Sequence, residues 1–177
     1  MAHAAQNVLI EYIKENQDKL YRIAYTYTKN QEAALDVVQE AITKSLENIG
    51  RLRNEEYVKT WFYRILINEA IKASKSIKYF VDYDTVQSEL RTSSHEEQLV
   101  ENIDMYTIIQ KLNKKLKTVI ILRFFENLKI EEIAYVTKTN PNTVKSRLYK
   151  GIEEIKKSIE RRSLWVYGKK LRKRIIR

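Results

Sequence analysis

The stretch from Lys129 to Lys157 constrains the fold most, because it contains two helical periodicities separated by a turn. Its apolar residues are Ile130, Ile133 and Ala134 in the first part and Val144, Leu148, Ile152 and Ile155 in the second. Spacing of three and four positions places side chains on one face of an α-helix. Two amphipathic helices must therefore bury these faces together, and the small Ala134 would allow a close approach.

The turn lies between Thr137 and Pro141. A residue before proline is pushed out of helical geometry, whereas proline itself suits the first position of a helix. Asn140 is therefore the predicted N-cap of the second helix, because its side-chain carbonyl can accept from a free backbone N–H of the first turn. The stretch has the organisation of a helix-turn-helix.

The polar face of the second helix carries donors and cations without a carboxylate. Its residues are Asn142, Thr143, Lys145, Ser146, Arg147, Tyr149 and Lys150. This chemistry suits a helix in the DNA major groove, where Lys and Arg meet guanine acceptors and phosphates. A helical hairpin with a solvated polar face is the alternative, since short motifs also occur by chance. We favour DNA binding.

The net charge of +10 supports that interpretation less than it first suggests. Residues 161–177 hold eight Lys or Arg and no acid, so only +2 belongs to residues 1–160. The better evidence is local: residues 137–150 contain no acid at all. A basic face on one helix is the expected electrostatic signature of a DNA-reading element.

Helices joined by short polar segments are the expected regular structure of this chain. Of 177 residues, 44% are hydrophobic, which is enough for a core, but only 3 are Gly and 1 is Pro, so turns between strands are hard to make. The expected fold class is all-α. Periodicity predicts one helix ending near Thr28, a second from about Gln31 to Ile49, and a third after Asn54. Gly50 is expected to end the second helix in the left-handed conformation.

Composition excludes several classes of function. The chain has no Cys, and His3 and His95 stand far apart without ligand-spaced carboxylates, so we expect no metal, no cofactor and no catalytic site. We therefore expect a non-enzyme with no small-molecule substrate. No apolar run approaches the roughly 20 residues that span a bilayer, and the start of the chain lacks a signal pattern. The expected location is cytoplasmic.

The chain divides into two expected domains. Residues 1–78 form the first and residues 105–162, with the helix-turn-helix, the second. Residues 79–104 hold seven acids against one Arg from Asp82 onward, which is typical of a flexible, self-repelling linker. Residues 163–177 form a basic tail, for which a solvated disordered end is the default interpretation. Nonspecific attraction to DNA and contact with an anionic membrane surface are the alternatives.

Two segments together resemble the sigma factors of bacterial RNA polymerase. The first reads ALDVVQEAITKSLENI and then VKTWFYRILINEAIK, similar to the N-terminal core region, and the second reads LRFFENLKIEEIAYVTKTNPNTVKSRLYKGIEEIK, similar to the C-terminal DNA-binding region. Two motifs in the expected order are far more specific than one helix-turn-helix. The absence of other sigma domains points to the small two-domain class, the extracytoplasmic-function (ECF) sigma factors of the sigma-70 family.

The resemblance implies three sets of binding residues. Those expected to bind the polymerase clamp are Asp36, Gln39 and Glu40. Those expected at the minus-ten promoter element are Leu52, Arg53, Asn54, Lys59, Tyr63, Arg64, Asn68 and Lys72. Those expected at the minus-thirty-five element are Asn142, Thr143, Lys145, Ser146, Arg147 and Lys150. Holding an extruded base needs a pocket that stacks and hydrogen-bonds it.

Two local expectations follow from the same segments. Trp61, Phe62 and Tyr63 are adjacent and cannot share one helix face, so we expect Trp61 and Phe62 to be mostly buried and Tyr63, with Arg64, more accessible. For Trp61, packing is favoured over base stacking. Lys129 stands where the family usually has a capping serine, which would weaken the start of that helix by about 1 kcal/mol.

The resemblance also implies partners. They are core RNA polymerase, promoter DNA and an inhibitory anti-sigma factor, expected to be membrane-anchored, which would hold the protein at the membrane until a stress signal releases it. The genes transcribed would serve envelope stress. Two alternatives remain: a stand-alone helix-turn-helix transcriptional regulator, and a helical adaptor without a nucleic-acid role.

Overall fold

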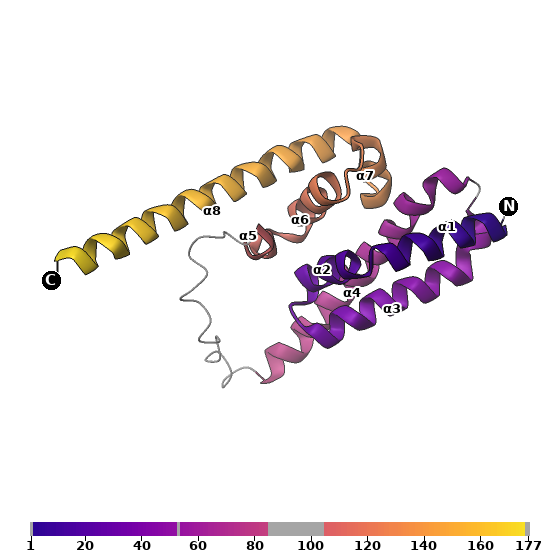
Figure 1. Ribbon diagram of the computed structural model, residues 1–177, viewed down its shortest axis with the longest axis horizontal. Helices are drawn as coiled ribbons and strands as arrows, with labels where there is room; N and C mark the ends of the chain where they lie inside the picture. The colour runs from indigo at the N-terminus through magenta and orange to yellow at the C-terminus, as the bar shows by residue number, and fades with distance from the viewer. Residues whose placement is uncertain (1, 53, 85–104, 176–177) are drawn as a thin grey trace.

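A computed structural model describes residues 2–52, 54–84 and 105–175, and within these ranges every regular element is helical and none is a strand (Figure 1). This confirms the all-α prediction. The elements are α1 (Ala2–Glu15), α2 (Gln17–Thr28), α3 (Gln31–Asn48), η1 (Ile49–Arg51), η2 (Glu55–Tyr57), α4 (Val58–Asp84), α5 (Met105–Lys111), α6 (Lys114–Ile120), η3 (Ile121–Phe125), α7 (Ile130–Thr137) and α8 (Pro141–Ile175).

The N-terminal body, α1 to α4, packs around apolar side chains that are almost completely buried, among them Leu9, Leu20, Ile23, Phe62 and Leu66. Asparagines start its helices: the Asn30 side chain accepts from the Ala33 N–H at 2.8 Å, and the Asn54 side chain from the Glu56 N–H at 3.0 Å. These caps fix the N-terminal ends of α3 and of the turn that leads into α4.

One expectation for this body is wrong. Gly50 lies in the 3₁₀ turn η1 and has no positive φ, because the chain leaves α3 by tightening its last turn and not through a left-handed residue. Helix α4 continues to Asp84, past the expected domain end at residue 78. Of the expected linker, residues 79–84 are thus helical, and residues 85–104 lie outside the described residues.

The C-terminal body, α5 to α8, contains the helix-turn-helix as α7 and α8. After α6 the backbone widens into the π-helical turn η3. Helix α8 crosses α6 closely at Gly151, where a Cβ would lie 2.9 Å from Ile120 Cγ1. It then runs to Ile175, so the tail that we expected to be disordered is helical as far as that residue, and its C-terminal half extends beyond the other helices (Figure 1).

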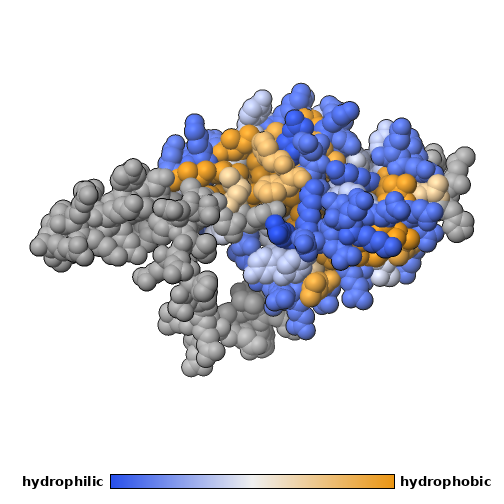
Figure 2. Space-filling view, viewed as in Figure 1, coloured by the Kyte–Doolittle hydropathy of each residue, from blue (hydrophilic) through white to orange (hydrophobic). Residues whose placement is uncertain are grey.

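The two bodies share one hydrophobic cluster, which includes Leu20 and Phe62 from the first and Leu122 and Ile133 from the second. Helix α7 packs against α4, and α5 against α2. Hydrophilic residues cover most of the outer face in view, with apolar patches between them (Figure 2). The two bodies agree with the expected architecture of two small helical domains, and in the described residues they pack against each other.

Candidate nucleic-acid interface

The recognition helix starts where the turn chemistry predicts. Asn140 Oδ1 accepts from the Thr143 N–H at 2.7 Å, and Pro141 is the first residue of α8. Beneath it, Ala134 and Val144 are buried between α7 and α8. The cap satisfies one of the free N–H groups of the first turn, so the start and the direction of this helix are both fixed.

The face predicted for the minus-thirty-five element is open to solvent. Asn142, Lys145, Ser146 and Lys150 are exposed, and Thr143 and Arg147 are half-buried. The first carboxylate of α8 is Glu153, so nothing acidic interrupts this face. Lysines and arginines on such a surface can neutralise phosphates, and amide and hydroxyl groups can meet base edges.

Tyr149 lies among these residues and was not selected from the sequence as a contact. Its side chain is 73% exposed, the most of any large hydrophobic residue among those described. Its position off the apolar stripe of α8 was the only available signal.

The start of α7 is supported in a way that the sequence did not reveal. The Lys129 side chain has no acceptor and makes no cap, as expected, but the Lys129 N–H donates to Glu132 Oε2 at 2.6 Å. This is the returning half of a capping box. Glu132 therefore partly compensates for the missing side-chain cap at the start of α7. Its other carboxylate oxygen accepts from Thr60 of the N-terminal body.

The residues predicted for the minus-ten element fall into two groups. Asn54, Asn68 and Lys72 are exposed and Leu52 is half-buried, all on the outer side of the N-terminal body. Arg53 lies outside the described residues. The remaining three, Lys59, Tyr63 and Arg64, contact the C-terminal body. The structure therefore does not bring all members of this set together on one open face.

A pocket of about 280 Å³ lies beside the open group, between α3 and α4. It is lined by Lys44, Asn48, Arg51, Trp61, Ile65, Asn68 and Glu69. Trp61 is half-buried where we expected it mostly buried, because its side chain lines this pocket. An indole face beside amide and guanidinium groups suits a stacked, hydrogen-bonded base. Trp61 and Arg51 were not selected from the sequence.

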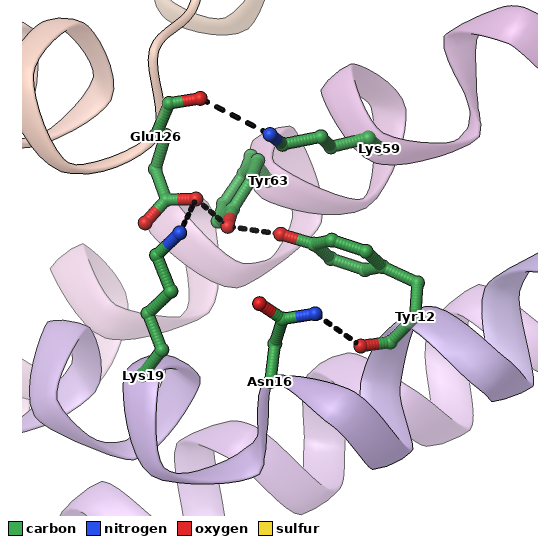
Figure 3. Close-up of polar contacts among 6 residues, drawn as sticks. All are labelled: Tyr12, Asn16, Lys19, Lys59, Tyr63 and Glu126. Atoms are coloured by element: carbon green, nitrogen blue, oxygen red, sulfur yellow. Dashed lines mark hydrogen bonds and ion pairs between the residues drawn. The ribbon is translucent and has the colours of Figure 1, made fainter.

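The expectation that Tyr63 is accessible is wrong, since its side chain is fully buried. Helix α4 is covered on two sides, by α2 and α3 and by α1 with the C-terminal body, so both Phe62 and Tyr63 point inward. The Tyr63 hydroxyl donates to Glu126 Oε2 and also hydrogen-bonds the Tyr12 hydroxyl (Figure 3). Helix α4 therefore buries side chains on more than one of its faces, whereas the sequence analysis expected one buried stripe.

Lys59 and Arg64 meet the C-terminal body as well. Lys59 Nζ donates to the Glu126 backbone carbonyl at 3.1 Å (Figure 3). The Arg64 guanidinium lies over the Tyr135 ring, 4.9 Å from its centre, which is within the range of a cation–π interaction.

The predicted polymerase-binding residues Asp36, Gln39 and Glu40 are all exposed on α3. Glu40 pairs with Lys44 at 2.9 Å, which lowers the pKa of the Glu40 carboxyl, and Lys44 also pairs with Glu69 at 2.8 Å. Beside them Leu35 is 53% exposed. Its apolar side chain lies outside the buried stripe of α3, and the sequence analysis did not select it.

No group of His, Cys, Asp or Glu among the described residues could hold a metal ion. Within the same residues, no helix combines the length and the apolar character that crossing a membrane requires.

Two family descriptions match the chain. Residues 12–78 match sigma-70 region 2, and residues 103–155 match sigma-70 region 4. The first match covers α2 to α4, with the minus-ten and polymerase sets, and the second covers the helix-turn-helix. The two segments that carried the resemblance thus lie in two separately matched regions.

Similar proteins agree. RNA polymerase sigma factor SigV of Bacillus subtilis (strain 168) is 41% identical over 149 residues, 82% of this chain and 87% of the relative. The ECF RNA polymerase sigma-E factor of Haemophilus influenzae is 30% identical, over 86% of this chain and 94% of its own length. The fold is similar to that of the sigma factor RpoE from Bartonella quintana, solved in complex with the anti-sigma factor NepR, with a TM-score of 0.66 at 16% identity, covering 85% of this chain and 95% of that one. The chain therefore belongs to the extracytoplasmic-function sigma factors of the sigma-70 family.

Proposed function

We propose that this sigma factor binds core RNA polymerase and directs it to promoters through two surfaces, one on each body. The observation that carries the proposal is the kind of side chains that the two surfaces expose. One surface is the exposed, acid-free face of α8, and the other is the pocket lined by Arg51, Trp61 and Asn68. Each lies in a segment that matches a different sigma-70 region.

On α8, we assign minus-thirty-five recognition to Asn142, Thr143, Lys145, Ser146, Arg147 and Lys150, with Tyr149 as an added contact. The long cations at Lys145 and Lys150 can reach phosphates or guanine edges, while the shorter Asn142 and Ser146 can meet only groups close to the helix. Phosphate contacts would set the position of the helix, and base contacts would supply the sequence preference.

On the N-terminal body, we assign minus-ten recognition to Leu52, Arg53, Asn54, Asn68 and Lys72. The Trp61 pocket takes an unstacked base, because an indole face stacks any base and the surrounding amides and cations can hydrogen-bond its edge. Lys59, Tyr63 and Arg64 belong to the same set only when the C-terminal body leaves them free.

The polymerase is proposed to bind α3 at Asp36, Gln39 and Glu40, with the exposed Leu35 beside them. The chemistry of RNA synthesis then belongs to the polymerase, and this protein acts as a non-enzymatic subunit without a cofactor. The proposed functional units are residues 1–78 and 105–162, joined by residues 79–104 and followed by the basic segment 163–177.

An anti-sigma factor is proposed as a further partner, supported by the complex in which the structurally similar RpoE was solved. We propose that this inhibitor is membrane-anchored, that the sigma factor acts in the cytoplasm once released, and that its regulon serves envelope stress. Of the alternatives, a stand-alone transcriptional regulator does not account for the region 2 segment, and an adaptor without a nucleic-acid role does not account for the acid-free face of α8.

Transcription in vitro tests the proposal. Core polymerase from Bacillus subtilis and a pool of promoter fragments should yield transcripts only when this chain is added. The Lys145→Ala/Lys150→Ala variant should lose most of this activity, because both cations lie on the proposed DNA face. Lys156→Ala is the matched control, since Lys156 is also exposed on α8 but beyond that face.

The same experiment separates the rival functions. Tight, specific duplex binding by the chain alone, with no effect on polymerase, would favour a stand-alone regulator. Full activity of the double variant would favour the adaptor. Absence of chain-dependent initiation would overturn the proposed function.

A further inference from the structure

The C-terminal part of α8 lies outside both family matches. The region 4 match ends at residue 155, whereas α8 continues to Ile175 and its C-terminal half extends beyond the other helices (Figure 1). From Arg161 onward the sequence holds eight Lys or Arg and no acid. The same segment contains apolar and aromatic residues, from Leu164 to Tyr167 and again at Leu171 and Ile175.

The helical backbone determines which of these positions share a side of α8. Residues 164, 168, 171 and 175 follow one another at spacings of four and three, so they lie on one side of the helix. The sequence places Leu164, Gly168, Leu171 and Ile175 there. The flanks and the opposite side hold the cations Lys169, Lys170, Arg172, Lys173 and Arg174. This is the pattern of an amphipathic helix with a narrow apolar side and a broad cationic side.

The apolar side of this segment does not continue the side of α8 that packs in the C-terminal body. Val144 is buried, and Ile155 packs against the core. From Ile155 to Leu164 the helix makes about two and a half turns, so these two positions lie on opposite sides of α8. The contacts of α8 with α6 and α7 use the side of Val144 and Gly151. The apolar side of the basic segment therefore fits a different partner.

The same geometry argues against DNA as that partner. Ser146 and Leu164 lie about five turns apart, so the apolar side of the segment is on the same side of α8 as the proposed DNA face. If α8 followed a duplex, positions 164, 171 and 175 would be nearest to it, and the cations would lie to the flanks and behind. Phosphate contacts require cations on the facing side.

An anionic lipid surface fits both sides of the segment. The apolar side can enter the boundary between headgroups and acyl chains, while Lys and Arg on the flanks reach lipid phosphates with their long side chains. Each cation near such a surface strengthens binding about fivefold. Trp165 and Tyr167 belong to the residue types that are enriched at membrane interfaces. Charge and apolar pattern thus point to the same partner.

We propose that residues 161–175 of α8 form an in-plane anchor that binds anionic phospholipid bilayers. Because the apolar side of this anchor lies on the same side of α8 as Ser146 and Lys150, a bilayer that holds the anchor also faces the proposed DNA surface. Membrane and promoter DNA therefore compete for the protein. The competition rests on the proposed function, whereas lipid binding does not depend on it.

Co-sedimentation with vesicles tests lipid binding by the full-length chain. Vesicles of one third phosphatidylglycerol and two thirds phosphatidylcholine should bind it at least tenfold more tightly than vesicles of phosphatidylcholine alone. Added salt should weaken the binding, because it screens exposed charges. Lys169→Gln/Lys170→Gln should weaken binding to the anionic vesicles at least tenfold.

A second variant tests the apolar side without a change in charge. Leu164→Gln/Leu171→Gln should bind the anionic vesicles at least tenfold more weakly, because each leucine would otherwise leave water. Val166→Gln is the matched control. Val166 belongs to the same segment but lies about three turns from Ile155, on the opposite side from Leu164, so this variant should bind like the wild type.

Transcription with core polymerase tests the competition. Anionic vesicles should lower transcription by the wild-type chain several-fold at limiting sigma concentration, and vesicles of phosphatidylcholine alone should not. Leu164→Gln/Leu171→Gln should transcribe like the wild type without lipid, since neither residue belongs to a proposed promoter surface. It should also keep this activity when anionic vesicles are added.

The outcomes separate the two proposals. If the chain binds both kinds of vesicle equally, or if Leu164→Gln/Leu171→Gln binds like the wild type, the anchor is wrong and the proposed function stands. Loss of affinity for a duplex of random sequence in Lys169→Gln/Lys170→Gln, without vesicle binding by the wild type, would assign the segment to DNA instead. Vesicle binding that leaves transcription unchanged would overturn the competition. If the wild-type chain fails to initiate without lipid, the proposed function is overturned, and the vesicle assay still decides on the anchor.

Discussion

Gly151→Ala should destabilise the protein although it improves helix propensity. Alanine in a helix interior is favoured over glycine by about 1 kcal/mol. Against this, the new Cβ would lie 2.9 Å from Ile120 Cγ1 and 3.1 Å from Ile120 Cδ1. Ile120 is 1% exposed, so it has little room to move, and overpacking of a core costs about 1–3 kcal/mol. The cost of the close contact should exceed the gain in helix propensity, so the free energy of unfolding should fall by about 1 kcal/mol.

The assay is urea unfolding followed by circular dichroism, with thermal unfolding beside it. A loss of about 1 kcal/mol in a chain of this size lowers Tm by roughly 2–4 °C. Gly50→Ala is the matched control, because its Cβ would meet nothing within 4 Å and its φ is not positive. That variant should be neutral or slightly more stable.

A double variant tests the cause. Ile120→Ala removes the two atoms that Gly151→Ala would approach, so the cost of the pair should be smaller than the sum of the single costs by about 1 kcal/mol. Additive effects, or a rise in stability of Gly151→Ala, would refute the close-contact explanation. Either result would mean that α8 can shift over α6 and that the position of the recognition face is not set by Gly151.

Three further outcomes follow from individual contacts. Asn140→Ala should cost about 1 kcal/mol in urea unfolding by removing the cap of α8, and Asn140→Asp should retain most of it. Lys145→Ala should reduce the slope of log affinity against log salt by about 0.9 in promoter binding by the holoenzyme if Lys145 contacts a phosphate, and leave the slope unchanged if it reads a base. Burial lowers the pKa of Lys117 from 10.5 to about 8, so the folded chain releases this proton before the unfolded chain does and the free energy of unfolding should rise from pH 8 to pH 9.5. Lys117→Met should lack that rise when unfolding is measured at each pH.

Local rules predicted the local structure. The start of α8 at Pro141 and the cap at Asn140 depend only on the residues of one turn, and the structure confirms both. The all-α class follows in the same way from periodicity and from the shortage of Gly and Pro. The open face of α8 follows as well, because polar residues off an apolar stripe face solvent unless another element covers them.

Contacts between distant segments were not predictable in this way. Periodicity identified one buried stripe on α4, but Tyr63 is buried by residues 51 and 63 positions away, Tyr12 and Glu126. Trp61 was expected in the core, but it lines a pocket with residues of α3 and η1 that are distant in the sequence, among them Asn48 and Arg51. Gly50 was expected to take the left-handed conformation because glycine often does so after a helix. The chain instead leaves α3 through a 3₁₀ turn, which that rule does not consider.

Glu126 shows why such a contact matters more for conformation than for stability. A carboxylate buried with one unpaired oxygen loses hydration that Lys19 and Tyr63 only partly replace, and buried ion pairs of this kind often contribute less than apolar side chains of the same size. An apolar residue at this position would stabilise several relative positions of the two bodies, because apolar contacts have no preferred direction. The carboxylate is satisfied only where Tyr63 and Lys19 converge, so it defines one arrangement of the bodies without making that arrangement strongly favoured.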